Sequence, residues 1–139
     1  MAEAVLKKLT RTAGVESEFE IASAATTPEE LGNPVYPMAR QELAKHGIGC
    51  PGHKARLLDM DDYEHYDLIV GMDTENVEDM QRFFLGDPLN KLFRLLDFTD
   101  SPRDIADPWY TRDFRSAWND IYAGCTALFN KLSDGGATA

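Results

Sequence analysis

The sequence predicts an α/β domain in which helices cover both faces of a doubly wound parallel sheet. Two observations predict this class. Helical and strand periodicities alternate along the chain, and the short apolar run at residues 68–70 is typical of a strand buried on both faces. A chain of 139 residues suffices for one such domain with its own core. We therefore expect a single domain over residues 1–132 and a disordered tail over residues 133–139, which is rich in small and polar side chains.

The first half of the chain is expected to form two helices and a strand. Residues 2–13 carry apolar side chains at helical spacing, and Gly14 ends that helix. Residues 19–24 are predicted as a strand. Residues 37–46 are predicted as the second helix, because a proline occupies the first turn and Gly47 follows the last one.

The second half is expected to alternate helix and strand. Residues 61–66 form a short helix and residues 68–70 a strand. A helix follows over residues 73–84, with its first residue, an aspartate, as N-cap. A second buried strand is predicted over residues 92–96 and a long final helix over residues 114–132. From the helices predicted over residues 73–84 and 114–132, the side chains expected to face the core are Val77, Met80, Phe84, Ile121, Cys125, Leu128 and Leu132.

Composition and charge exclude several classes of function. The formal net charge is -10 with a pI near 4.6, so the surface repels phosphate backbones and we expect no nucleic-acid partner. Apolar runs are too short to cross a membrane, and the first residues carry no secretory pattern, which favours a cytoplasmic location. Cys50 and Cys125 suggest no disulfide framework, and no Cys/His cluster has zinc spacing. We expect neither a metal nor a cofactor.

The tetrapeptide Asp107-Pro108-Trp109-Tyr110 is the strongest candidate for chemistry. A residue before proline is restricted to extended conformations, so the carboxylate of Asp107 has a constrained backbone. The two aromatic residues that follow suit a slot for a flat ring, beside an acid directed at a leaving-group oxygen. An ordinary Asx turn with aromatic residues packed against it explains the same four residues, since Asp-Pro often begins turns.

Eight short segments decide between these interpretations, and their order along the chain resembles that of the low-molecular-weight protein-tyrosine phosphatase family. The resemblance extends from residue 1 to about residue 132, and it implies the three-layer α/β fold of that family. The segments are Met1-Ala2-Glu3-Ala4, Ser23-Ala24-Ala25-Thr26, Gly32-Asn33-Pro34, His46-Gly47-Ile48, His53-Lys54-Ala55-Arg56, Tyr66-Asp67-Leu68-Ile69-Val70-Gly71-Met72-Asp73, Leu95-Leu96-Asp97-Phe98 and Asp107-Pro108-Trp109-Tyr110.

The resemblance also implies a mechanism and a substrate class. In the family, a Cys-x5-Arg-Ser/Thr loop at a helix N-terminus binds phosphate, and its thiolate forms a phosphocysteine intermediate. By resemblance, Asp107 is the general acid and then the general base, while Trp109 and Tyr110 line the ring slot. The implied substrate is a phosphotyrosine-containing protein or a small aryl phosphate.

Three further residues acquire roles by the same resemblance. Ser23 and His53 are expected to brace the phosphate loop through hydrogen bonds. Glu29 occupies a region where relatives often carry an aromatic residue that flanks the substrate ring. It either selects against acidic phosphopeptides or is simply solvated.

The main departure from the family lies at Met1. The family's phosphate loop immediately precedes the segment that begins here, so the resemblance implies that the first, central strand and the catalytic Cys and Arg are missing. Either the start codon has been assigned too late or the protein is a truncated pseudophosphatase. We expect almost no turnover by these 139 residues, and a fold that shifts its strands, exchanges an element in a swapped homodimer or is only marginally stable.

Two other possibilities concern the cysteines. Cys50 and Arg56 also fit Cys-x5-Arg, but the residue after Cys50 is a proline without an amide proton, and Leu57 replaces the expected hydroxyl residue. Arsenate reduction on the same fold needs a relay of cysteines that Cys50 and Cys125 do not provide. A non-catalytic, partner-binding relative remains the alternative function.

Overall fold

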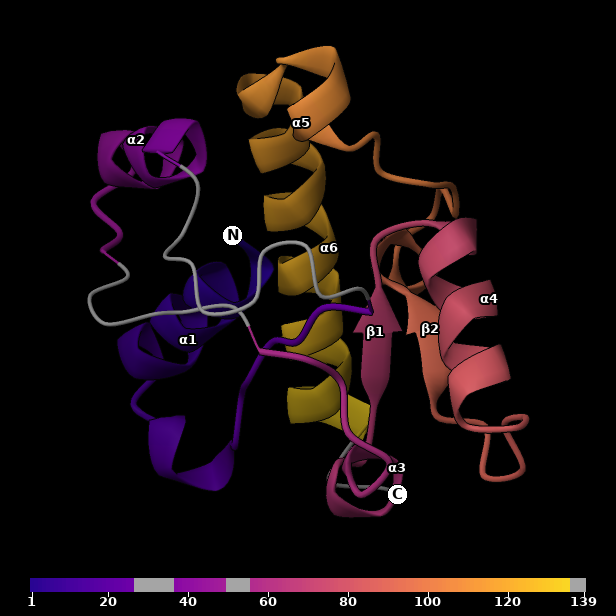
Figure 1. Cartoon of the computed structure of the whole chain (residues 1–139). Coiled ribbons are helices and arrows are strands. Elements are labelled where there is room, and N and C mark those ends of the chain that lie inside the picture. The colour runs from indigo at the N-terminus through magenta and orange to yellow at the C-terminus, as the bar shows by residue number, and fades with distance from the viewer. Residues whose placement is uncertain (27–36, 50–55, 136–139) are drawn as a thin grey trace.

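The computed structural model describes residues 1–26, 37–49 and 56–135 (Figure 1). Its strands are β1 (Ile69–Gly71) and β2 (Leu92–Arg94), and two 3-10 turns, η1 (Glu16–Glu18) and η3 (Leu95–Phe98), flank the longer elements. Its helices are α1 (Ala2–Thr12), α2 (Pro37–Lys45), α3 (Asp62–His65), α4 (Thr74–Phe83), α5 (Pro108–Thr111) and α6 (Phe114–Gly135).

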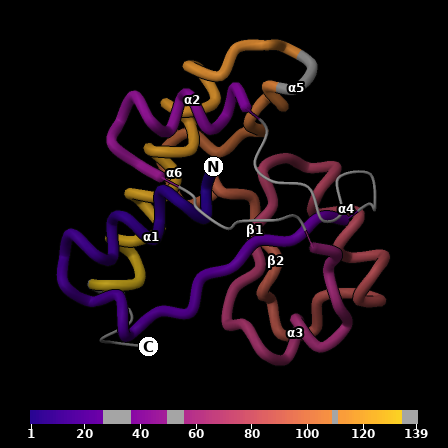
Figure 2. Tube along the Cα trace, turned by 60° about the vertical axis from the view of Figure 1, so that its left-hand side comes forward, coloured from indigo at the N-terminus to yellow at the C-terminus, as the bar shows by residue number. Residues whose placement is uncertain are grey.

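Helices cover both sides of a short parallel sheet, as the sequence predicts for an α/β protein. β1 and β2 pair in parallel, with Ile69 opposite Leu92 and Gly71 opposite Arg94. The connecting helix α4 packs on one side of the two strands, while α6 packs against η3, which continues β2. α1 lies beside α6, and α2 packs on the first turns of α6. These three helices form the layer on the side of the sheet opposite α4 (Figures 1 and 2).

The strand predicted over residues 19–24 is wrong. Within the described residues this segment has no ladder, and only the next residue, Ala25, forms a single parallel bridge with Leu57. The amide of Ala25 donates to the carbonyl of Arg56 at 2.7 Å, and the amide of Leu58 donates to Ala25 at 2.9 Å. Apolar alternation alone does not make a strand, because a strand also needs a neighbouring backbone with which to exchange hydrogen bonds.

The two remaining strands were predicted correctly in place but differ in detail. Ile69 and Val70 are half-buried rather than enclosed on both faces. The strand predicted over residues 92–96 ends at Arg94, because the carboxylate of Asp97 accepts a hydrogen bond from the Arg94 amide at 2.9 Å and the chain turns into η3.

The predicted helices are confirmed, with small shifts at their ends. Asp73 caps α4 by accepting a hydrogen bond from the Asn76 amide at 2.7 Å. Gly47 follows α2 with a φ of +73°, a conformation that glycine adopts without steric cost. α6 continues to Gly135, three residues beyond the predicted end at Leu132. Residues 136–139 lie outside the described residues.

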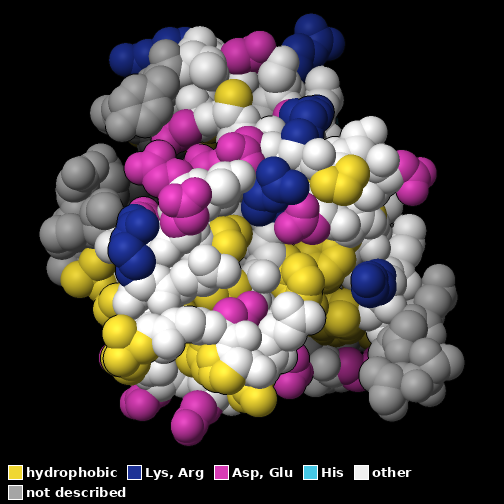
Figure 3. All heavy atoms as spheres, turned by 90° about the vertical axis from the view of Figure 1, so that its right-hand side faces the viewer, with side chains coloured by type: hydrophobic (Ala, Val, Ile, Leu, Met, Phe, Trp, Pro, Cys, Tyr) yellow, Lys and Arg dark blue, Asp and Glu magenta, His cyan; other side chains and the backbone are white. Residues whose placement is uncertain are grey.

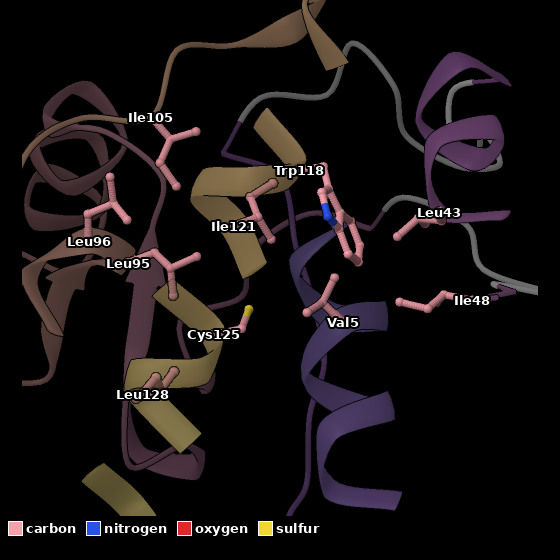
Figure 4. Close-up of a cluster of buried hydrophobic side chains, with 10 residues drawn as sticks. All are labelled: Val5, Leu43, Ile48, Leu95, Leu96, Ile105, Trp118, Ile121, Cys125 and Leu128. Atoms are coloured by element: carbon pink, nitrogen blue, oxygen red, sulfur yellow. The ribbon is translucent and has the colours of Figure 1, made fainter. Parts of the chain in front are cut away.

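Helix α6 organises the core. Figure 4 shows its buried side chains between two groups, one from the sheet side (Leu95, Leu96, Ile105) and one from α1, α2 and the segment that follows α2 (Val5, Leu43, Ile48). The buried residues of α6 in this cluster are Trp118, Ile121, Cys125 and Leu128. The core positions predicted for Ile121, Cys125 and Leu128 are therefore confirmed, and Leu132 packs at the edge of the cluster.

A second, smaller apolar cluster lies under α4 and contains Met80 and Phe84, as predicted. The surface on this side mixes acidic groups with apolar side chains (Figure 3). Phe83, Leu85 and Leu89 at the end of α4 and in the loop after it are 41%, 87% and 63% exposed. None of the helices in the described ranges combines the length and hydropathy needed to cross a bilayer.

Candidate active site

The loop over residues 99–107 leads from η3 to Asp107 and passes across the carboxyl ends of β1 and β2 (Figure 1). In parallel α/β sheets, ligand sites lie at these strand ends, because the loops that follow the strands converge there. The fold therefore brings the Asp-Pro segment to the end of the sheet at which a ligand is expected.

Asp104 fastens this loop to two elements through one oxygen. Its Oδ1 accepts hydrogen bonds from the Thr74 amide at 2.9 Å, from the Thr74 hydroxyl at 2.8 Å and from Nη1 of Arg94 at 3.0 Å. Thr74 begins α4, where helix amides lack internal acceptors, and Arg94 ends β2. The Thr74 hydrogen bonds, and then that of Arg94, hold the pKa of Asp104 below its ordinary value of 3.8.

The residues on either side of Asp104 are attached to two other elements. The amide of Ile105 donates to the carbonyl of Met72, directly after β1, at 3.0 Å, and its side chain is buried in the core. Arg103 forms two hydrogen bonds with the carboxylate of Asp120 on α6, at 2.7 and 3.1 Å. Three consecutive residues thus connect the loop to β1, β2, α4 and α6.

Asp107 is exposed and stands at the start of α5. Its carbonyl accepts the Thr111 amide at 3.2 Å, and the carbonyl of Pro108 accepts the Arg112 amide at 2.8 Å, which closes the single turn of this helix. Arg112 then adopts a φ of +61°, and the chain enters α6. The carboxylate predicted to be the acid is therefore held on a short, regular turn.

The other predicted site residues are only partly described. The backbone of Trp109 and Tyr110 forms part of α5, while their side chains lie outside the described part of the structure. Glu29 and His53 also lie outside it. The roles predicted for these four residues stay predictions.

Ser23 has a defined partner. Its hydroxyl donates to Oε1 of Glu3 at 2.7 Å, and Oε2 of the same carboxylate accepts a hydrogen bond from Lys7 at 2.8 Å. This contact ties the segment before Ala25 to the first turn of α1. The predicted bracing of a phosphate loop by Ser23 is not tested by this contact.

The cysteines differ in their suitability as nucleophiles. Cys125 is 1% exposed, and its thiol donates to the Ala2 carbonyl at 3.7 Å. Burial raises the pKa of this thiol to about 12, so almost none of it is thiolate at neutral pH. Cys50 lies outside the described residues.

Arg56, the arginine of the alternative Cys-x5-Arg segment, is already paired. It donates from Nη1 and Nη2 to the two carboxylate oxygens of Asp62 at 3.1 and 3.4 Å, and this hydrogen bonding raises the pKa of Arg56. The guanidinium of Arg56 is therefore bound to a carboxylate of the protein, whereas the arginine of a phosphate loop binds the phosphate of the substrate.

A separate cleft of about 360 Å³ lies between α2 and the first turns of α6. The His46 and Trp118 rings stack in its lining at 3.7 Å between centroids, and Nε2 of His46 lies 3.1 Å from the buried carboxylate of Glu42. The described residues that line this cleft include neither a thiol nor a hydroxyl. Across the described ranges, no three His, Cys, Asp or Glu side chains are grouped to hold a metal ion.

The residues that fasten the loop were not predicted from the sequence: Arg94, Asp104, Thr74, Arg103 and Asp120. One signal was present, because Thr74 lies at the start of the helix predicted over residues 73–84, where polar groups gather in this class of fold. Arg94 lies in the middle of the strand predicted over residues 92–96 and ends the strand only in the structure. Their partners are distant in sequence, so the pairs themselves appear only in the folded chain.

Comparisons with known proteins agree with this architecture. Residues 1–137 match the model of the family described as low molecular weight phosphotyrosine protein phosphatase. The chain is 30% identical over 134 residues to the low molecular weight protein-tyrosine-phosphatase YfkJ of Bacillus subtilis, a match that covers 95% of this chain and 86% of that protein. It is 34% identical over 137 residues to the low molecular weight phosphotyrosine protein phosphatase of Gallus gallus, covering 94% and 85%.

A solved structure gives the same result for the fold. The crystal structure of YfkJ from Bacillus subtilis superposes with a TM-score of 0.93 at 28% sequence identity, covering 96% of this chain and 86% of that one.

Proposed function

Because the chain belongs to the low molecular weight phosphotyrosine protein phosphatase family, we propose that its fold serves the hydrolysis of phosphotyrosine or other aryl phosphate monoesters, with Asp107 as general acid and base. The observation that carries this proposal is the family match over residues 1–137, which includes the Asp-Pro segment. The substrate we propose is a phosphotyrosine-containing cytoplasmic protein.

The proposed reaction has two steps. A thiolate attacks phosphorus, the bond to the phenolic oxygen breaks, and Asp107 gives its proton to that oxygen. Asp107, now a carboxylate, takes a proton from water as the water attacks the phosphocysteine, and thiolate and phosphate are released. The exposure of Asp107 at the carboxyl end of the sheet is compatible with both proton transfers.

We propose that neither cysteine of these 139 residues is the attacking thiolate. Cys125 is buried, and its pKa is raised to about 12. The arginine that follows Cys50 at the required spacing is bound to Asp62. A Cys-x5-Arg loop joined ahead of Met1, beside the N-terminus of α1, supplies the nucleophile and a ready anion site in this proposal.

The test compares the 139-residue chain with an extended chain, in which the residues of the Bacillus subtilis relative that precede the matching segment are joined ahead of Met1. Hydrolysis of p-nitrophenyl phosphate is measured for both. We expect almost no turnover by the 139 residues and a clear rate for the extended chain. Asp107→Asn should then lower kcat at least about tenfold, as expected for loss of the group that acts first as general acid and then as the general base in hydrolysis of the phosphocysteine.

Three outcomes contradict the proposal. Ready turnover by the 139-residue chain that is lost in Cys50→Ser would make Cys50 the nucleophile. A folded but inactive extended chain would favour the non-catalytic, partner-binding alternative. An unchanged kcat in Asp107→Asn would remove Asp107 from the mechanism. A mass measurement in solution on the 139 residues tests the predicted swapped homodimer separately.

A further inference from the structure

The segment that carries Asp107 is attached to the rest of the molecule by the residues just before the acid. Arg103, Asp104 and Ile105 contact α6, the pair Thr74 and Arg94, and the residue after β1, respectively. Ile105 is 2% exposed, whereas Ala106 and Asp107 are exposed. These contacts with the rest of the fold thus lie within four residues of the carboxylate in the chain.

We propose that Asp104 is a positioning residue for the general acid: by joining Arg94 and Thr74 through one carboxylate oxygen, it sets where Asp107 stands relative to the leaving-group oxygen. This inference rests on the proposed function, since it assumes that Asp107 is the acid. Asp104 does not touch substrate in this proposal and acts only through the loop.

The geometry explains why Asp104 has this effect. Thr74 contributes its amide and its hydroxyl, so two donors from one residue fix the carboxylate against the start of α4. Arg94 adds the end of β2, and its guanidinium is oriented in turn by Asp97, whose Oδ1 accepts from Nε at 3.0 Å. Asp104 thereby fixes the position of Asp107 relative to the carboxyl ends of β1 and β2, where ligand sites form in this class of fold.

Proton transfer depends steeply on position. A general acid must lie within hydrogen-bond reach of the leaving oxygen, and a displacement of about 1 Å can cost up to a hundredfold in rate. Only Ala106 separates Ile105 from Asp107, so a shift of the backbone that follows loss of the Asp104 contacts is passed on to the acid without unfolding of the core. The expected loss of rate is therefore largest for substrates whose leaving-group oxygen must be protonated as it departs.

The choice of substrate separates positioning from general damage. Phenolate is a poor leaving group and needs protonation, whereas p-nitrophenolate leaves with little help. In the extended chain, Asp104→Ala should lower kcat/KM about tenfold for phenyl phosphate and less than about threefold for p-nitrophenyl phosphate. The ratio kcat/KM reports the step in which the phenolic oxygen leaves and not the later hydrolysis of the phosphocysteine, which is the same for both substrates. Asp104→Asn, which keeps an acceptor oxygen, should restore part of the loss.

Matched variants keep the test decisive if Asp104→Ala folds poorly. Thr74→Val keeps the amide and the side-chain shape but removes one of the three donors, and a smaller loss in the same direction is expected. Asp100→Ala changes an exposed aspartate of the same loop, for which the described residues show no hydrogen bond, and it should change neither rate.

A second measurement uses the 139 residues as they are. Amide hydrogen exchange should become at least about tenfold faster at Ile105 in Asp104→Ala, while Val77 inside α4 keeps its rate. Equal loss of kcat/KM on both substrates, or no faster exchange at Ile105, overturns the positioning role.

The failure of this inference can be told apart from failure of the proposed function. If Asp107→Asn shows the selective defect on phenyl phosphate and Asp104→Ala does not, only the positioning role is wrong. If Asp107→Asn shows no selective defect, Asp107 is not the acid, and the positioning role falls with it.

Discussion

Replacing Gly124 by alanine tests the close packing of α6 on η3. An ideal Cβ at this position lies 2.5 Å from Cγ and 3.0 Å from Cδ2 of Leu95, whereas carbon atoms in contact are about 3.5–4.0 Å apart. Leu95 is 2% exposed and has little room to move. Overpacking of this kind costs about 1–3 kcal/mol, while alanine in place of glycine inside a helix stabilises by about 1 kcal/mol.

Together these two effects should lower the free energy of unfolding of Gly124→Ala by about 0–2 kcal/mol, which corresponds to a fall in Tm of up to about 8 °C for a chain of this size. The assay is thermal unfolding followed by circular dichroism, repeated in a Leu95→Ala background. With the large side chain removed, Gly124→Ala should stabilise by about 1 kcal/mol, because only the helix propensity remains. A higher Tm for Gly124→Ala in the presence of Leu95 would refute the packing argument.

Further predictions concern the core, the buried thiol and acid stability. Leu43→Ala should lower the free energy of unfolding in urea by about 2–5 kcal/mol, because Leu43 is fully buried, whereas Leu89→Ala at an exposed site should change it by less than about 0.5 kcal/mol. In a Cys50→Ser chain, Cys125 should stay unlabelled by a thiol reagent until the protein is denatured, and rapid labelling of the native state would contradict its raised pKa. The pKa values of Asp87 and Asp104 lie below the ordinary 3.8, so the stability that they contribute is complete above that pH and is lost as the pH falls through their folded-state values. The fall in Tm measured below about pH 4 should therefore be smaller in Asp104→Asn than in the unmodified chain.

The lowered pKa of Asp87 has a clear structural origin. Burial alone would raise it, but the hydroxyl of Tyr63 and the amides of Lys91 and Leu92 donate to the carboxylate and outweigh burial. The loop after α4 is thereby fastened to α3. This contact joins residues 24 positions apart, and no local pattern predicts it.

Local features were predictable because their causes are local. The Asp73 cap, the stop at Gly47 and the apolar spacing of α6 each involve residues within a few positions of one another, and the structure confirms all three. The strand predicted over residues 19–24 is wrong for the opposite reason, because the hydrogen bonds of a strand come from a distant part of the chain.

The candidate site divides in the same way. A carboxylate before a proline, followed by two aromatic residues, could be recognised from four adjacent letters at Asp107. The bonds that fasten its loop join Asp104 to Thr74 across 30 positions and Arg103 to Asp120 across 17. The sequence itself carries the chemical type of the acid and the helices that frame it, because these depend on neighbouring residues. Where that acid is held relative to the strand ends depends on which distant polar groups the packed core brings within hydrogen-bonding distance, and this became visible only in the folded chain.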